Sequence, residues 1–211
     1  MSIDHAYSPK EEQLNTVSHG AGVLFSIYVL WELLSKAQNY AEIISAGIYG
    51  TSLFLLFLSS TLYHASTRSE VRAFYKKCDH CAIYILIAGT YTPFLVLSLQ
   101  GIWSVATLLF IWSLALGGVV YKLVVKNQSK KVSLSTYLLM GWFAVAIIYP
   151  MYLNVDVNAL WWLLAGGIFY SLGTFFYSAK HRQFSHAVWH IFVIAGCVCH
   201  YISISRYLLT R

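Results

Sequence analysis

The sequence predicts an all-α integral membrane protein, a bundle of seven transmembrane helices. Of its 211 residues 58% are hydrophobic and only 10% are charged, and the mean hydropathy is +0.63. An average soluble domain has about 25% charged and 45–50% apolar residues, so that class is excluded. Since one membrane span needs about 20 apolar residues, there is room for about seven spans in one domain, residues 1–211.

Each expected helix is placed on a segment that lacks Asp, Glu, Lys and Arg, and some extend a few residues beyond it. The segment 80–121 is 42 residues long, too long for one helix, and the turn-forming Leu99-Gln100-Gly101 divides it into a third and a fourth span. Every other charge-free segment has the length of a single span. In chain order, the expected helices are 17–35, 43–64, 79–98, 102–125, 132–152, 157–178 and 184–207.

The basic residues predict the orientation of this bundle. With seven spans, 11 of the 14 Lys and Arg residues lie on the side of the N-terminus, and only Lys36, Arg206 and Arg211 lie on the other. The positive-inside rule then places the N-terminal segment 1–16 in the cytoplasm and the C-terminus outside. Because the net charge of +6 is spread over short loops without a contiguous basic face, no nucleic-acid partner is expected.

Six ionisable residues from distant parts of the chain are expected at the cytoplasmic ends of the helices. Histidine and aspartate are costly within a membrane, which makes each of them a candidate functional residue. They are His19 at the start of the first helix, His64 at the end of the second, Asp79 and His80 at the start of the third, and His186 and His190 at the start of the last.

The spacing of the histidines favours a metal site. His186 and His190 are four residues apart, which places both imidazoles on one helix face. With His64 as a third ligand, they form the open three-histidine arrangement of catalytic zinc sites. Asp79 is then a ligand, a partner of the zinc-bound water or a general base. Ser60, one turn before His64, faces the same way and can hydrogen-bond a water or a substrate oxygen.

Each of these residues also has a structural interpretation. The paired histidines can hydrogen-bond neighbouring helices, His64 can face lipid headgroups, and Ser60 can serve close helix packing. Asp79 can cap the third helix. Their common depth favours the metal site over these alternatives.

The remaining histidines and the cysteines are less informative. Cys78 and Cys81 lack the second ligand pair of a zinc knuckle. His200 lies about 15 Å beyond His190 along the same helix and is expected to form an internal hydrogen bond. His5 and His181 are expected in flanking or loop positions.

Five motifs are distributed along nearly the whole chain. They are Glu11-Glu12-x-x-Asn15-x-x-x-His19-Gly20, Ser59-Ser60-Thr61-Leu62-Tyr63-His64, Asp79-His80-x-x-Ile83-Tyr84, Ala88-Gly89-Thr90-Tyr91-Thr92-Pro93-Phe94 and His186-x-x-Trp189-His190-x-Phe192. In order and spacing, the chain resembles the hemolysin III family, the bacterial branch of the progestin and adipoQ receptor superfamily. Order and spacing together make the resemblance specific.

The resemblance implies a seven-helix protein of the bacterial plasma membrane with a cytoplasmic-side Zn²⁺. Its ligands would be His64, His186 and His190, with Asp79 nearby and Ser60 one turn before the first histidine. The wider superfamily includes alkaline ceramidases, which implies metal-dependent hydrolysis of lipid amides or esters. The family name implies membrane lysis, and the eukaryotic relatives are receptors.

We therefore expect a zinc-dependent hydrolase of a membrane lipid, with Asp79 as general base and Ser60 holding the oxyanion or the water. The alternative is a membrane-lytic, receptor or regulatory protein with a structural zinc. A transporter ranks last because the ionisable residues lie at one end of the helices. The sequence leaves open the substrate, the oligomeric state and the identity of the metal.

Overall fold

The computed structural model describes residues 7–179 and 182–209, and within these ranges it contains helices and no strands. Seven of its helical segments are long and apolar enough to cross a membrane, which confirms the predicted fold class. They are α1 (Pro9–Lys36), α2 (Tyr40–Ala65), α3 (Ser69–Ser98), α4 (Gly101–Val124), the composite segment α5 (Lys130–Trp142), η1 (Phe143–Ile147) and α6 (Ile148–Asn154), then α7 (Val157–Ser178) and α8 (Ser185–Tyr207).

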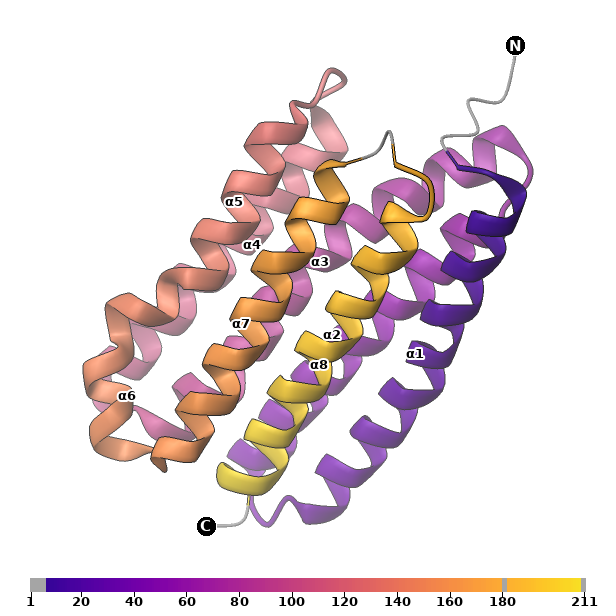
Figure 1. Ribbon diagram of the computed structural model, residues 1–211. Coiled ribbons are helices and arrows are strands. Elements are labelled where there is room, and N and C mark those ends of the chain that lie inside the picture. The colour runs from indigo at the N-terminus through magenta and orange to yellow at the C-terminus, as the bar shows by residue number, and fades with distance from the viewer. Residues whose placement is uncertain (1–6, 180–181, 210–211) are drawn as a thin grey trace.

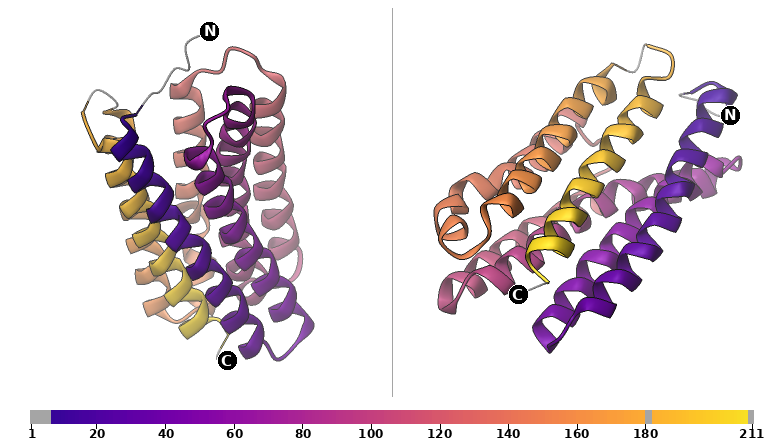
Figure 2. Two further views of the ribbon diagram at one scale, coloured as in Figure 1. Left: turned by 90° about the vertical axis from the view of Figure 1, so that its right-hand side faces the viewer. Right: turned by 60° about the horizontal axis from the view of Figure 1, so that its bottom comes forward.

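The helices run side by side and neighbours in sequence pack together (Figures 1 and 2). The last described helix, α8, packs against both α7 and α1, so the first and last helices of the bundle are in contact. The most buried of the spans is α3, which contacts α2, α4, α5, α6 and α8. This arrangement places the end of α2 and the starts of α3 and α8 at the same end of the bundle.

Local sequence signals explain several helix ends. Ser8 accepts a hydrogen bond from the Glu11 amide at the start of α1, where Pro9 occupies the first position. The turn expected at Leu99-Gln100-Gly101 is present, because α3 ends at Ser98 and α4 begins at Gly101. Gly101 has φ +61°, a conformation that glycine adopts without strain.

Two helices begin earlier than expected. The expected starts are residues 17 and 79, whereas α1 begins at Pro9 and α3 at Ser69. The charge-free segments marked the apolar part of each helix, but charged residues continue both helices beyond it. Asp79 consequently lies ten residues inside α3 and does not cap it, so the capping interpretation of Asp79 is wrong.

The fifth span is interrupted, which differs from the single helix expected over 132–152. Its middle part is the 3₁₀ segment η1 between α5 and α6. Tyr91 of α3 supplies the hydrogen bonds that this irregular backbone needs within a membrane: its hydroxyl accepts from the Ala144 amide at 2.7 Å and lies 2.7 Å from the Gly141 carbonyl oxygen. Irregular backbone at this depth is tolerated because a buried side chain satisfies it.

Candidate metal centre

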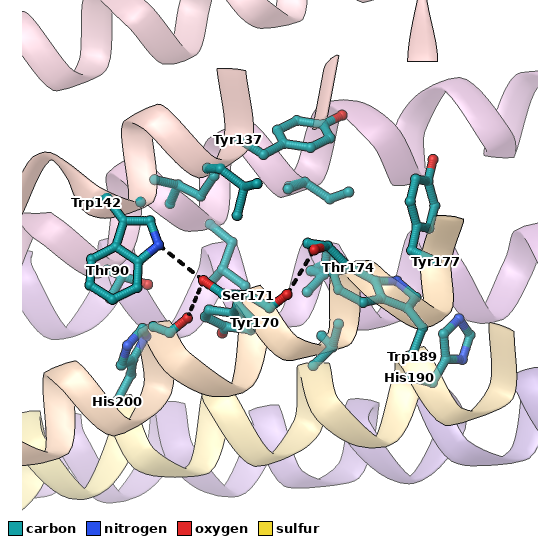
Figure 3. Close-up of a pocket in the computed structure, with 18 of the residues that line it drawn as sticks. Thr90, Tyr137, Trp142, Tyr170, Ser171, Thr174, Tyr177, Trp189, His190 and His200 are labelled. Atoms are coloured by element: carbon teal, nitrogen blue, oxygen red, sulfur yellow. Dashed lines mark hydrogen bonds between the residues drawn. The ribbon is translucent and has the colours of Figure 1, made fainter. Parts of the chain in front are cut away.

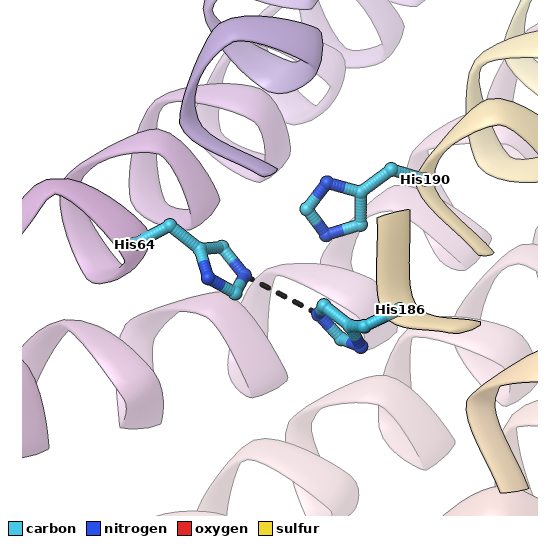
Figure 4. A group of neighbouring side chains, drawn as sticks. All are labelled: His64, His186 and His190. Carbon is cyan, nitrogen blue, oxygen red and sulfur yellow. Dashed lines mark hydrogen bonds between the residues drawn. The ribbon is translucent and has the colours of Figure 1, made fainter. Parts of the chain in front are cut away.

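The fold brings together the three histidines that the sequence predicts as metal ligands (Figure 4). His64 comes from the last turn of α2, and His186 and His190 from the first two turns of α8. All three side chains are buried, and one ligand atom from each lies within 4.8 Å of the others. The Nε2 atoms of His64 and His186 are 3.3 Å apart.

This separation suits a tetrahedral ion. Two nitrogens bound about 2.0–2.1 Å from a tetrahedral zinc are about 3.3–3.4 Å from each other. The His64–His186 distance therefore already has the length of one edge of such a site.

The hydrogen-bond partner of His64 shows which ring nitrogen is available. Its Nδ1 atom lies 2.7 Å from Oε2 of Glu12, and because a carboxylate only accepts, Nδ1 carries the proton. In the neutral ring, Nε2 is then left with its lone pair directed at His186. Glu12 is itself held by an ion pair with Arg72, whose guanidinium also donates to the Tyr63 carbonyl oxygen at 3.2 Å.

His190 is oriented in the same way by a serine. The Ser18 hydroxyl donates to the Asn15 carbonyl oxygen at 3.1 Å, and Ser18 Oγ also lies 3.1 Å from His190 Nδ1. Since the hydroxyl has only one proton to give, it accepts from Nδ1 and leaves the Nε2 lone pair of His190 free. Buried imidazole lone pairs that converge can bind a cation between them, so the three residues fit a metal ion.

The α1 residues that orient the ligands, Glu12 and Ser18, were not predicted as site residues. Glu12, Asn15 and His19 have the i, i+3, i+7 spacing of one helix face, a signal that could have found Glu12 but not Ser18. The signal was missed because the first helix was expected to begin at residue 17. Residues 9–16, expected to precede the first span, are helical and reach the site.

His19 lies at the site without belonging to the ligand group. Its ring stacks on that of His190, with centroids 3.5 Å apart and planes inclined by 14°. Only 3% of His19 is exposed, and within the described ranges neither of its ring nitrogens has a hydrogen-bond partner. Its nitrogens are thus available to a molecule bound beside the three histidines.

Asp79 and Ser60 face each other across the α2–α3 contact. Both line the cavity beside the histidines, and the Ser60 side chain hydrogen-bonds the Asp79 carboxyl. Asp79 is not part of the group of ligand atoms that lie within 4.8 Å of one another. His80 lines the same cavity, and its carbonyl oxygen accepts from Tyr137 at 2.9 Å.

A largely apolar cavity of about 200 Å³ extends from this centre into the bundle (Figure 3). Tyr7 lies at its metal-centre end, where its ring stacks on His186 with centroids 4.6 Å apart. Burial raises the pKa of the Tyr7 hydroxyl above its ordinary value, which keeps it neutral. Beyond this end, the wall of the cavity is formed mainly by aliphatic and aromatic side chains of α3, α5 and α7.

Within the described residues, the cysteines and His200 lie outside this centre. All four cysteines are free thiols, and none of them joins a metal-binding group in the part of the chain that the structure describes. His200 Nε2 lies 3.2 Å from the Leu163 carbonyl oxygen, the internal hydrogen bond that was expected. His5 and His181 lie outside the described residues.

Comparison with known proteins identifies the family. The sequence model described as "Haemolysin-III related" matches residues 7–201. The chain is 42% identical over 204 residues to the Bacillus subtilis (strain 168) "Hemolysin-3 homolog", covering 95% of this chain and 96% of that protein. It is 39% identical over 203 residues to the Bacillus cereus "Hemolysin-3", covering 95% and 93%.

A more distant relative connects the chain to the wider superfamily. The Drosophila melanogaster "Adiponectin receptor protein" is 23% identical over 244 aligned residues, which cover 93% of this chain and 50% of the receptor. Together with the seven apolar helices, these matches show that the chain is a multi-pass bacterial membrane protein belonging to the hemolysin III family of the progestin and adipoQ receptor superfamily.

Proposed function

We propose that this protein is a zinc-dependent hydrolase that cleaves an amide or ester bond of a membrane lipid at the cytoplasmic side. One observation carries the proposal: the metal-binding nitrogens of His64, His186 and His190 converge beside an apolar cavity that Asp79 also lines. A structural metal needs no cavity beside it, whereas a catalytic one needs space for a substrate.

His64, His186 and His190 would hold the proposed metal. Zinc in such a site lowers the pKa of a bound water to about 7 and polarises a carbonyl oxygen. The chain's own contribution begins with Glu12 and Ser18, which hold two ligands in the tautomer that binds a metal. Arg72 holds Glu12 in place for that purpose.

Asp79 is proposed as the group that moves the proton. Its carboxylate accepts a proton from the attacking water and returns it to the nitrogen or oxygen of the leaving group. Ser60 orients the carboxyl through its hydrogen bond and is placed to contact the water or the substrate oxygen. His19, whose ring nitrogens have no hydrogen-bond partner within the described ranges, can contact the substrate carbonyl.

The lining of the cavity supports a lipid as substrate. Its walls between the two polar ends are apolar and lie within the part of the bundle that spans the membrane. A hydrocarbon chain fits such a lining because its apolar surface is removed from water and no polar group is buried without a hydrogen-bond partner. A water-soluble polar substrate has no comparable set of partners.

The first experiment is metal analysis of purified protein by mass spectrometry. We expect about one zinc per chain in the wild type, and loss of it in His64→Ala and His190→Ala. His80→Ala is the matched control, since this histidine lines the same cavity outside the ligand group, and it should retain zinc. If wild-type protein purified without chelator contains no metal, the proposal is wrong.

The second experiment measures turnover of a ceramide and of a phospholipid by the zinc-loaded protein. Asp79→Asn should hold zinc and lose turnover, which separates the proton-transfer group from the ligands. Hydrolysis of neither lipid by zinc-loaded wild type would contradict the enzymatic proposal.

The names of the two Bacillus relatives favour a second candidate, a membrane-lytic protein in which zinc is structural. Dye leakage from sealed vesicles distinguishes the two. Leakage that persists in Asp79→Asn, without lipid hydrolysis by the wild type, supports lysis.

A further inference from the structure

The cavity has a second polar end, opposite the metal centre. Figure 3 shows Thr90, Trp142, Ser171 and His200 grouped there, whereas Tyr177, Trp189 and His190 lie at the other end. His190 and His200 are ten residues apart on α8, a rise of about 15 Å. A simple hydrocarbon pocket does not require polar side chains at this depth.

His200 has an acceptor atom that is not satisfied. Its Nε2 atom lies 3.2 Å from the Leu163 carbonyl oxygen, and because a carbonyl only accepts, Nε2 carries the proton of the neutral ring. Nδ1 is therefore an acceptor. It is buried and has no hydrogen-bond partner within the described residues, and His200 as a whole is 6% exposed. A buried acceptor left without a donor is destabilising.

Three of the neighbouring donors are engaged elsewhere. Trp142 Nε1 donates to Ser171 Oγ at 3.0 Å, and the Ser171 hydroxyl donates to the Gly167 carbonyl oxygen at 2.8 Å. The Tyr170 hydroxyl pairs with Cys197 Sγ at 3.1 Å. Since no described residue donates to His200 Nδ1, a molecule bound in the cavity can supply the donor.

Close packing fixes the position of the His200 ring. The ring lies over Gly166 of α7, where an added Cβ would come within 2.2 Å of His200 Nε2. The absence of a side chain at Gly166 lets α7 and α8 approach with the imidazole between them. The orientation of Nδ1 is consequently set by the backbone of two helices.

We propose that this end of the cavity binds a hydroxyl group on the hydrocarbon chain of the lipid, with the hydroxyl donating to His200 Nδ1. The inference rests on the proposed function, because it takes the occupant of the cavity to be a lipid. It adds a specificity determinant: a chain hydroxylated about 15 Å from the metal-centre end is preferred over a plain chain.

The test compares the binding of three fatty acids to purified full-length protein, measured by displacement of a fluorescent fatty acid. The probes are octadecanoic acid, 12-hydroxyoctadecanoic acid and 2-hydroxyoctadecanoic acid, the last with its hydroxyl beside the carboxyl group. We expect the 12-hydroxy acid to bind about tenfold more tightly than the other two, as one added hydrogen bond to a buried acceptor implies.

Variants assign the preference to His200. His200→Phe keeps a flat ring and should bind all three acids equally, whereas Tyr170→Phe, which removes a nearby hydroxyl already paired with Cys197, should keep the preference. If His200→Phe does not fold, the wild-type comparison of the 12-hydroxy and 2-hydroxy acids decides.

If the wild type binds the three acids with equal affinity, the hydroxyl subsite is wrong and water is the donor to Nδ1. The proposed lipid hydrolase is not contradicted by that result. Binding of none of the acids overturns the subsite together with the lipid substrate. A preference without hydrolysis of any lipid supports the subsite while the proposed enzymatic function fails.

Discussion

The Nδ1 atom of His64 lies 2.7 Å from Oε2 of Glu12, so a residue in the first turn of α1 orients a candidate metal ligand at the end of α2. The same carboxylate is ion-paired with Arg72 of α3. Three helices therefore meet through one acidic side chain. The proposed metal site depends on residues that contact the ligands as well as on the ligands themselves.

Glu12→Gln should weaken zinc binding about tenfold, because partners of ligating histidines typically contribute 10–100-fold to metal affinity. The amide retains an acceptor but loses the charge that favours Nδ1–H. Competition with a zinc chelator measures the change, and Glu70→Gln, on an exposed glutamate of α3, is the matched control. Equal zinc affinities in the two variants would show that Glu12 serves only the fold.

Ser18→Ala should also weaken zinc binding, because His190 loses the acceptor that holds its proton on Nδ1. We expect a loss of about tenfold. Ser18→Thr keeps the hydroxyl and should restore most of the affinity. The same chelator competition applies, and a threonine variant as weak as the alanine variant would contradict the hydrogen-bond role.

Zinc should stabilise the bundle. A ligand that binds only the folded state at 100 times its Kd adds about 2.7 kcal/mol, so chelation should lower the Tm of the wild type measurably. His64→Ala should show a Tm that responds to neither chelator nor added zinc. A wild-type Tm that chelation leaves unchanged speaks against an ion bound to α2 and α8.

Asp79→Asn should lose at least a hundredfold in turnover of the lipid substrate, the usual contribution of a general base. Its zinc content should match that of the wild type, since Asp79 is outside the ligand group. Ser60→Ala should show a smaller loss, because it removes only a partner of the carboxyl. Loss of zinc from Asp79→Asn would instead make Asp79 a ligand.

Tyr91→Phe should destabilise the protein by about 1–3 kcal/mol, the cost of leaving a buried polar group unsatisfied. The phenylalanine leaves the Ala144 amide in η1 without its acceptor. Tyr84→Phe, which removes a hydroxyl bonded to Thr136, is the comparison, because Thr136 can still donate to the Ser133 carbonyl oxygen. Denaturant unfolding in detergent should rank the two losses in that order.

The sequence predicted the fold class and the three-histidine group because both depend on strong signals. Apolar segments of membrane length identify spans, and the i, i+4 histidines on one helix leave only the third ligand to be found. The contribution of α1 was not predicted, since its charged first turns do not look like part of a span. Glu12 and Ser18 contact the ligands only because α1 packs against both α2 and α8.

The interruption at η1 had a local signal that the expected single helix did not take into account. Residues 132–152 have the apolar composition of a continuous helix, but Pro150 lies three residues after η1. Proline cannot donate to the carbonyl four residues earlier, which is that of Ala146 within η1. The hydrogen bonds that satisfy η1 come from Tyr91, more than fifty residues earlier on α3, and this tertiary contact could not be predicted from the local sequence.

The separation of the histidines along the chain has a consequence for biogenesis. His64 and His186 are 122 residues apart, and α8 is the last of the helices to leave the ribosome and enter the bilayer. A nascent chain that holds only α1 to α7 has one of the three histidines and would not retain the proposed ion. If the proposed metal binds, its loading would report the completion of insertion, and a chain that terminates before α8 would remain metal-free.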